Sequence, residues 1–427
     1  MEIEPLAELG PTRRAALFDR DAGIEDISDD VATIISQVRR KGDAALRQYS
    51  ADFDGIQVGN FAIGDDLKRA EEEIDQSIHH AIESAVDNVR EFHELQRRDD
   101  WWVDIGGRRL GRRFRPLDRI GAYVPGGTAA YPSSAIMTVI PAVVAGVEDI
   151  VVATPPGDPI NQVTLAALHI AGADEVYQVG GAQAIAALAY GTESIPRVQK
   201  IVGPGNQWVT AAKAAVQGDV EIDFLAGPSE ILVIADSTAT PEYIAADLIA
   251  QAEHGNTSPC VLVTDDKELA EAVVNALEKM TSAAARQANV REALEAPASG
   301  IFLARSMSEA ISFAETYAPE HLSIQTTDPG GILDRIDSVG SAFLGPMTPV
   351  AAGDYASGTN HVLPTNGVAK VAGGLSVDSF LRATTMQELD ASSLKEIGPT
   401  IKTLAKAEGL IGHAESVDIR LNDGRQR

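Results

Sequence analysis

The most direct candidates for chemistry are an adjacent glutamate and histidine, Glu320 and His321, which follow Pro319. Proline disfavours a helical conformation in the residue before it, so we expect the pair in a turn. A carboxylate and an imidazole side by side supply two proton acceptors, as general acid–base catalysis requires. An exposed Glu-His pair by itself is more often only solvated, so its interpretation depends on the other motifs.

A second candidate pair, Gln251 and His254, lies at the end of a helix that we expect over 241–254. Pro241 suits the first helical position and Gly255 suits the stop. Residues three apart share a helix face, so an amide oxygen and an imidazole would lie together, which resembles half of a nitrogen–oxygen metal site. A histidine that caps the last helical carbonyls is an equally good alternative.

Two more polar segments carry histidines. The glycine-punctuated run 353–361 contains Asp354 and His361, and a loop so rich in potential ligands is often functional, although Asx turns on a surface loop would explain it too. His413 lies near the C-terminus, where a histidine is usually incidental. Four of the eight histidines fall in such glycine-flanked segments, which is hard to attribute to chance.

Three glycine-rich turns follow expected strands, at 121–128, 179–183 and 203–208. The last begins like a dinucleotide fingerprint, but Trp208 occupies the place of its third glycine, so the full motif fails. Glycines still let backbone amides approach a phosphate at a helix start. Tyr123 could stack on a ring, and Gln183 and Asn206 could hydrogen-bond to it, although turn stabilisation is the commoner role for such residues.

Alternating strands and helices must position these residues. The first 120 or so residues read mostly as helix, including a segment at 30–38. After Gly121, short β-branched runs alternate with alanine-rich helical stretches, which predicts an α/β fold with parallel strands and a Rossmann-like unit. A second α/β stretch starts at Ile231, and the chain becomes helical again beyond about Phe380.

Composition excludes several classes of protein. The 62 Asp and Glu residues against 35 Lys and Arg give a formal net charge of −27, which argues against binding to nucleic acid or to an anionic membrane. A single cysteine, Cys260, excludes an intrachain disulfide and a cysteine-cluster metal site. No apolar run reaches the roughly 20 residues that a bilayer requires, and the N-terminus does not read as a signal peptide, so we expect a cytoplasmic protein.

The acidity itself has two interpretations. It could form a local surface for a cationic partner, or it could be a protein-wide adaptation to salt. The carboxylates are dispersed, and the cations are 10 Lys against 25 Arg. We favour a protein from a halophilic organism, in which salt screens the self-repulsion of the charges.

Taken in order, the motifs resemble those of the L-histidinol dehydrogenase family, which catalyses the last step of histidine biosynthesis. The resemblance runs from about residue 20 to 415. The segments that carry it are GAYVPGG, VGGAQAIAALAYG, IVGPGNQWV, FLAGPSEILVIAD, LIAQAEHG, APEHL, GDYASGTNHVLPT and EGLIGH.

The resemblance implies a role for each site residue. The acid–base pair would be Glu320 and His321. NAD+ would contact Tyr123, Gln183 and Asn206. One Zn2+ per subunit would bind Gln251, His254, Asp354 and His413. The substrate would be held by Ser229, Glu408, His321 and the zinc ligands Gln251, His254, Asp354 and His413. Glu408 and His413 would reach into the neighbouring subunit's site, which implies a homodimer with shared active sites.

The resemblance also implies two Rossmann-like lobes related to the aldehyde dehydrogenase fold, with helical N-terminal and C-terminal extensions. The expected parts are an N-terminal arm over 1–20, a lobe with the zinc and catalytic residues over 21–122 and 230–380, an NAD-binding lobe over 123–229, and a helical tail over 381–427.

The chemistry of histidinol oxidation fits these residues. An alcohol that becomes a carboxylate loses two hydrides, so two NAD+ must act in sequence, and the reactive aldehyde should be held between the steps. Cys260 lies in an apolar run outside every motif, so we expect a buried thiol and attack by water in place of a covalent thiol route.

Other functions stay open on the residues alone. The closest alternative is a related enzyme that oxidises another small alcohol on the same fold. Glu408 argues against a substrate that carries a sulfonate, because such a substrate would favour a cation at that position. A second alternative is a binding protein without catalytic activity, but such a protein would not need the adjacent Glu320 and His321. A third alternative is a zinc hydrolase, but a hydrolase would not need three turns of the kind that binds nucleotides.

Overall fold

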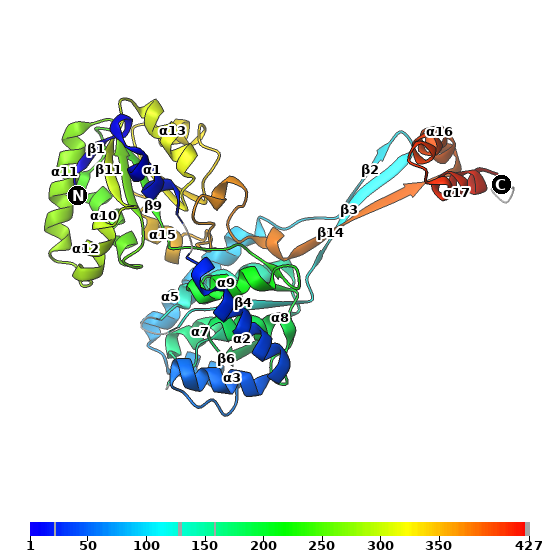
Figure 1. Cartoon of the computed structure of the whole chain (residues 1–427), viewed down its shortest axis with the longest axis horizontal. Coiled ribbons are helices and arrows are strands. Elements are labelled where there is room, and N and C mark those ends of the chain that lie inside the picture. The colour runs from blue at the N-terminus through cyan, green and yellow to red at the C-terminus, as the bar shows by residue number, and fades with distance from the viewer. Residues whose placement is uncertain (21–22, 127–129, 158, 423–427) are drawn as a thin grey trace. The chain divides into compact units, whose positions relative to one another are not determined.

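The computed structural model describes residues 1–20, 23–126, 130–157 and 159–422, and it forms two compact units (Figure 1). The first unit comprises 1–96 and 117–380, and the second comprises 97–116 and 381–427. The first unit contains two parallel sheets, each covered by helices, and we describe each sheet with its helices as a lobe. None of the described helices is long and apolar enough to cross a membrane.

One lobe is built on a six-stranded parallel sheet in the order β1-β11-β10-β9-β12-β13. Its strands are β1 (Ile3–Pro5), β9 (Ile231–Ala235), β10 (Cys260–Thr264), β11 (Gly300–Leu303), β12 (His321–Gln325) and β13 (Ser341–Leu344). Its helices are α1 (Pro11–Phe18), α10 (Pro241–Ala252), α11 (Lys267–Thr281), α12 (Gln287–Glu295), α13 (Met307–Tyr317), α14 (Pro329–Leu333) and α15 (Val350–Tyr355).

Alternation along the central strands explains why this sheet has helices on both faces. Ile231 and Val233 of β9 pack in one core with α10, α11 and α12, whereas Leu232 and Ile234 pack in another with α1 and α13. Successive strand residues point to opposite faces, so a strand buried at every position needs apolar side chains throughout. The sequence ILVIA meets that requirement.

The other lobe is built on a five-stranded parallel sheet in the order β6-β5-β4-β7-β8. Its strands are β4 (Arg119–Tyr123), β5 (Asp149–Thr154), β6 (Glu175–Gln178), β7 (Lys200–Val202) and β8 (Glu221–Ile222). Its helices are α2 (Ser28–Lys41), α3 (Asp43–Tyr49), α4 (Asp66–Glu73), α5 (Gln76–Glu94), α6 (Pro132–Ala145), α7 (Gln162–Ala171), α8 (Gly181–Tyr190) and α9 (Gln207–Val216). The predicted α/β fold with two Rossmann-like lobes is confirmed.

The predicted division of the first unit was wrong for its N-terminal part. We assigned 21–122 to the catalytic lobe, but α2 packs against α8 and α9 of the five-stranded lobe. Val31 and Ile34 of α2 share one core with Ala184 and Ile185 of α8. The small alanines of α8 let the apolar stripe of α2 approach closely, and a periodicity argument does not reveal that partner.

The second unit contains strands where we expected mostly helix before residue 120 and a helical tail beyond about Phe380. Strands β2 (Trp101–Ile105), β3 (Arg108–Pro116) and β14 (Leu381–Leu389) form an antiparallel sheet in the order β14-β3-β2. Two helices follow, α16 (Ala391–Ala407) and α17 (Ile411–Asn422). The tail predicted over 381–427 is therefore only partly helical. Gly106 and Gly107 both have positive φ, as a two-residue hairpin turn requires, so the Gly-Gly pair was the missed signal.

Candidate functional site

The candidate catalytic residues lie where two neighbouring parallel strands begin. His321 is the first residue of β12, and it pairs in register with Ile231, the first residue of β9. Glu320 and Glu230 directly precede these strands. Helix α10 follows β9 and must run back across the sheet, so its last turn returns to the edge at which the strands begin. Gln251 lies in that last turn.

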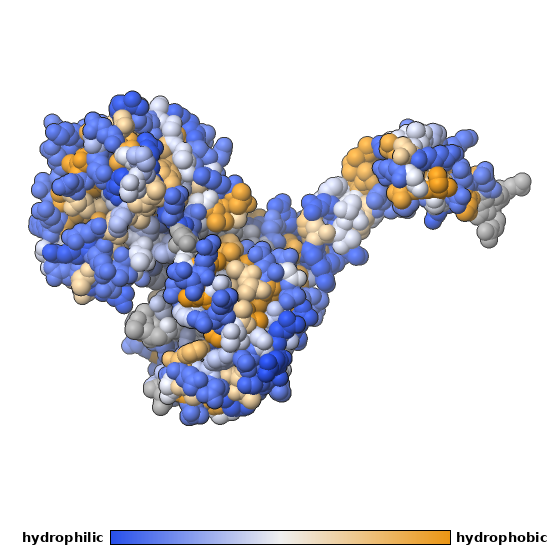
Figure 2. Space-filling view, viewed as in Figure 1, coloured by the Kyte–Doolittle hydropathy of each residue, from blue (hydrophilic) through white to orange (hydrophobic). Residues whose placement is uncertain are grey.

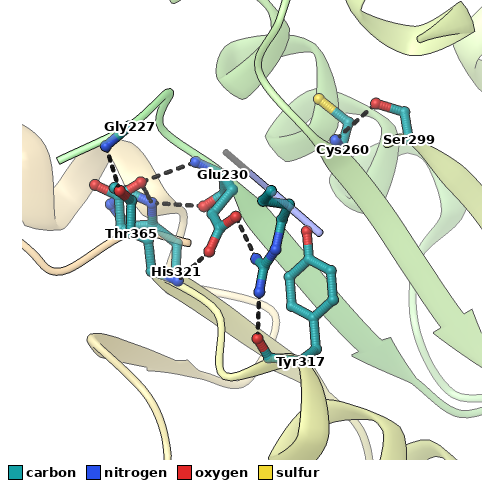
Figure 3. A network of polar contacts seen from close by, with 9 residues as sticks. Gly227, Glu230, Cys260, Ser299, Tyr317, His321 and Thr365 are labelled. Atoms are coloured by element: carbon teal, nitrogen blue, oxygen red, sulfur yellow. Dashed lines mark hydrogen bonds and ion pairs between the residues drawn. The ribbon is translucent and has the colours of Figure 1, made fainter. Parts of the chain in front are cut away.

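Backbone groups of Glu230 hold the Glu320–His321 pair in place (Figure 3). The Glu230 N–H donates to Glu320 Oε2 over 2.8 Å, and His321 Nδ1 lies 3.0 Å from the Glu230 carbonyl oxygen. Both side chains are buried, with 4% of each residue exposed. The expected turn is present, because Ala318 adopts a left-handed conformation just before Pro319. The pair is thus a rigid, enclosed element of the structure.

Burial and charge raise the pKa of Glu320 well above its usual value. Desolvation is the largest cause, the Glu230 N–H opposes it, and the charges of Glu230 and Asp354 add to it. The Ser229 hydroxyl also hydrogen-bonds to this carboxylate. A carboxylate with a raised pKa is a stronger base, which suits a group that must take a proton from water.

His321 is arranged to accept a proton at Nε2. A carbonyl oxygen can only accept a hydrogen bond, so Nδ1 carries the hydrogen and Nε2 carries the lone pair. Nε2 is buried without a hydrogen-bond partner, and Asp354 Oδ1 lies 3.9 Å away. Burial lowers the pKa of His321 to about 4, against the opposing charge of Asp354, so the imidazole is neutral at pH 7.

Three of the four predicted zinc ligands belong to the first unit. Gln251 is buried at the end of α10, His254 is exposed in the turn that follows, and Asp354 lies on α15. His254 and Asp354 both influence the pKa of His321 and of His361, so these groups are close together. Within the described ranges, no group of three or more His, Cys, Asp and Glu side chains is placed to hold a metal ion.

The donor set nevertheless fits zinc. An amide oxygen, a carboxylate and imidazole nitrogens are ligands that zinc accepts. The side-chain nitrogen of Gln251 is buried without a partner, and an amide can be placed with its oxygen in that position. His413 and Glu408 are exposed residues of the second unit, on and before α17.

Asp247 is a supporting residue that the sequence analysis missed. It lies on α10 one turn before Gln251, is 7% exposed, and accepts a hydrogen bond of 3.2 Å from Gln325 of β12. Burial raises its pKa to about 6, although hydrogen bonds from the Val350 N–H and Gln325 oppose the shift. Because Val350 begins α15, Asp247 links the helix of Gln251 to the helix of Asp354. A carboxylate on the apolar face of the predicted helix was the available signal.

The predicted NAD residues lie at the glycine turns of the other lobe, of which Gly127 and Thr128 are outside the described residues. Asn206 caps α9 by accepting from the backbone N–H groups of Trp208 and Val209 at 3.1 and 3.2 Å. Tyr123 is 3% exposed, so its ring has no open face for stacking, and its hydroxyl accepts from the Gly181 N–H over 3.1 Å. Gln183 is buried at the start of α8.

The turn over 203–205 requires glycine at its first and last positions because a side chain there would clash with the protein itself. A Cβ on Gly203 would lie 2.2 Å from the Tyr123 carbonyl oxygen, and one on Gly205 would lie 2.3 Å from a Val209 methyl carbon. The two glycines thus allow the tight turn that leads into α9, and a helix N-terminus favours an anion such as a cofactor phosphate.

Comparison with known proteins gives consistent matches over nearly the whole chain. The family model described as histidinol dehydrogenase matches residues 19–421. Histidinol dehydrogenases from the halophilic archaea Haloarcula marismortui and Natronomonas pharaonis are 62% and 60% identical, covering 98% and 99% of this chain and 99% and 100% of their own lengths. The solved structure of histidinol dehydrogenase from Elizabethkingia anophelis superposes with a TM-score of 0.93 at 38% identity, covering 98% of this chain and 97% of its own.

Proposed function

Because the chain belongs to the histidinol dehydrogenase family, we propose that it oxidises L-histidinol to L-histidine by a zinc-dependent, four-electron reaction that uses two NAD+ in sequence. Family membership makes it an oxidoreductase of histidine biosynthesis that acts on histidinol. The observation that carries the mechanism is the unpartnered Nε2 of His321, buried beside the carboxylate of Glu320.

The first oxidation needs a proton acceptor for the substrate hydroxyl. His321 is neutral, and its Nδ1–H is engaged by the Glu230 carbonyl, so Nε2 accepts that proton as the adjacent carbon loses its hydride. The product of this step is L-histidinal. A buried site keeps this aldehyde from bulk water until the second step.

The second oxidation needs water. Glu320 takes a proton from a water molecule as the water oxygen bonds to the aldehyde carbon, and protonated His321 returns its proton to the former aldehyde oxygen. These two transfers give the hydrated aldehyde and leave His321 neutral again. His321 then accepts a hydroxyl proton as the second hydride leaves, and the carboxylic acid forms and ionises. Bound NAD+ would supply the hydride acceptor in both oxidations, and the turns that carry Tyr123, Gln183 and Asn206 would hold it.

The substrate itself contains an amine and an imidazole, which are both good zinc ligands. Gln251, His254 and Asp354 would hold the ion together with His413 of the partner subunit. Bound zinc would mainly orient the substrate, with any polarising role secondary. Ser229 lies beside Glu320 and would contact the substrate, with Glu408 of the partner subunit near its imidazole.

The surface of the second unit supports a homodimer. Its sheet exposes a group of apolar side chains, and its helices α16 and α17 expose more, as the orange areas over these elements show in Figure 2. The exposed apolar residues are Trp101, Trp102, Val103, Ile105, Leu389, Leu404, Leu410, Ile411 and Ile419. Exposed apolar groups of this extent mark protein–protein contacts. A partner would cover them and would accept Glu408 and His413 into its own site.

We also propose that the enzyme works in a salt-rich medium. Its net charge is −27, and highly similar relatives come from Haloarcula, Natronomonas and Halobacterium species. Salt screens the repulsion among the dispersed carboxylates, which would otherwise destabilise the compact state.

The direct test uses the purified protein with zinc, NAD+ and L-histidinol in a series of salt concentrations. We expect NADH and L-histidine to form together. Absence of NADH at every salt concentration would contradict the proposal. Turnover of another small alcohol in preference to histidinol would favour a relative with a different substrate.

A further inference from the structure

A buried ion pair adjoins the Glu320–His321 pair and has no part in the mechanism above. Glu230 is fully buried, and its carboxylate pairs with the guanidinium of Arg20, whose side chain is 6% exposed. Arg20 and Glu230 lie 210 residues apart in the sequence. A buried ion pair contributes little to stability on average, because desolvation offsets the attraction, so its presence calls for another explanation.

Glu230 binds both catalytic residues through its backbone and its side chain. The two glutamates hydrogen-bond to each other reciprocally: the Glu230 N–H donates to Glu320 Oε2 over 2.8 Å, and the Glu320 N–H donates to Glu230 Oε1 over 3.3 Å. The Glu230 carbonyl oxygen also accepts from the His321 N–H and from His321 Nδ1, at 3.3 and 3.0 Å. Displacement of the Glu230 side chain would therefore release Glu320 on one side.

Arg20 holds the other end of the same turn, at Tyr317. The Arg20 guanidinium donates to the Tyr317 carbonyl oxygen and lies 3.7 Å from the centre of the Tyr317 ring. Tyr317 is the last residue of α13, and the left-handed Ala318 follows it. Arg20 thus connects the end of α13 to Glu230. The short segment that follows α13 is held at its start by the contact of Arg20 with Tyr317 and at its end by the hydrogen bonds between Glu230 and Glu320.

We propose that the buried Arg20–Glu230 ion pair positions Glu320 as the base of the second oxidation. Arg20 and Glu230 are positioning residues, since neither touches a reacting atom. The inference rests on the role proposed above for Glu320.

The local charges support this assignment. Glu230, Glu320 and Asp354 place three carboxylates near one another, and Arg20 is the cation paired with Glu230. Burial raises the pKa of Glu230, and the charge and hydrogen bond of Arg20 oppose that rise. Arg20 thereby favours the charged Glu230 carboxylate, which accepts from the Glu320 N–H.

The test compares Arg20→Met with Arg13→Met, because the two arginines make parallel contacts in the same N-terminal region. Arg13 pairs with Glu4, donates to the Ser299 carbonyl and lies 5.3 Å from the Phe302 ring centre, away from Glu320. Both steps are measured separately, with L-histidinol in single turnover and with L-histidinal as substrate. Zinc content and thermal unfolding are recorded for each variant.

In Arg20→Met we expect kcat for L-histidinal to fall by roughly 10- to 100-fold, with KM little changed and the histidinol step much less affected. Arg20→Lys should recover part of the loss, because it restores the cation without the planar fork. Arg13→Met should leave both steps near the wild-type rate. If Arg20→Met does not fold, Glu230→Asp serves as the test. This variant keeps the negative charge but moves the carboxylate back by one methylene, so we again expect a fall in kcat for L-histidinal with a much smaller effect on the histidinol step.

Equal loss of both steps, or lower stability with an unchanged kcat for L-histidinal, would overturn the inference. A wild-type enzyme that oxidises neither substrate would instead contradict the proposed function. The two failures are therefore distinguishable.

Discussion

Replacement of Cys260 by alanine separates attack by water from a covalent thiol mechanism. Cys260 is the first residue of β10 and is fully buried. Its thiol lies 3.3 Å from the Leu248 carbonyl oxygen and 3.5 Å from that of Ser258. Burial strongly raises the pKa of this thiol. A nucleophilic cysteine needs the opposite shift, so Cys260 is built as a packing residue.

We expect Cys260→Ala to lower the stability of the fold. Loss of a buried atom about the size of a methylene costs about 0.8 kcal/mol in transfer free energy. The void that remains adds several tenths of a kcal/mol, and the weak hydrogen bond is lost as well. We therefore expect the free energy of unfolding to fall by about 1–2 kcal/mol.

The activity of Cys260→Ala should stay within about twofold of the wild type, because water and not the thiol attacks the aldehyde. The measurements are kcat for L-histidinal, zinc content, and denaturant unfolding in the same salt. A loss of turnover by orders of magnitude, with zinc content and stability near wild type, would refute the reasoning and restore a covalent route.

Three further outcomes follow from the charges of the structure. Glu320→Gln should slow L-histidinal oxidation by at least about 100-fold and the alcohol step much less, and equal losses in separate half-reaction assays would contradict the assigned role. Burial raises the pKa of Asp43, but hydrogen bonds from Ser194 and Thr192 outweigh it and lower the pKa overall, so its stabilising effect is present at pH 7 and disappears as the pH falls below about 4. Asp43→Asn should therefore lower the free energy of unfolding by about 1–2 kcal/mol at pH 7 and by progressively less as the pH is lowered. A difference between variant and wild type that stays constant across the pH series would count against the argument. The melting temperature should rise with salt from low to molar concentration, and an indifferent melting temperature would contradict adaptation to salt.

The strand and helix alternation was predictable because it depends on local patterns. The run ILVIA at β9 and the alanine-rich α8 each show their burial in their composition. The strands β2, β3 and β14 were missed because their exposed residues do not give a clear apolar alternation. Only the Gly106–Gly107 pair marked a hairpin there.

The candidate site was predictable to the extent that its residues stand in motifs. The residue types and adjacency of Glu320 and His321 predicted an acid–base pair. The structure adds the tautomer of His321 and the absence of a hydrogen-bond partner at its Nε2, which adjacency cannot show. Asp247 left one signal, a carboxylate on the apolar face of its helix, but Arg20 was not predictable, because its partner Glu230 is distant in the sequence. Pairing of this kind is a property of the folded chain and leaves no local pattern.

The ratio of NADH to L-histidine tests the central claim most directly. The purified enzyme, with zinc, excess NAD+ and a limiting amount of L-histidinol, is followed to completion by NADH absorbance and by quantitation of both L-histidine and L-histidinal. The account predicts two NADH for each L-histidine, with no free L-histidinal at any time. One NADH for each L-histidinol, with L-histidinal accumulating in solution, would contradict it.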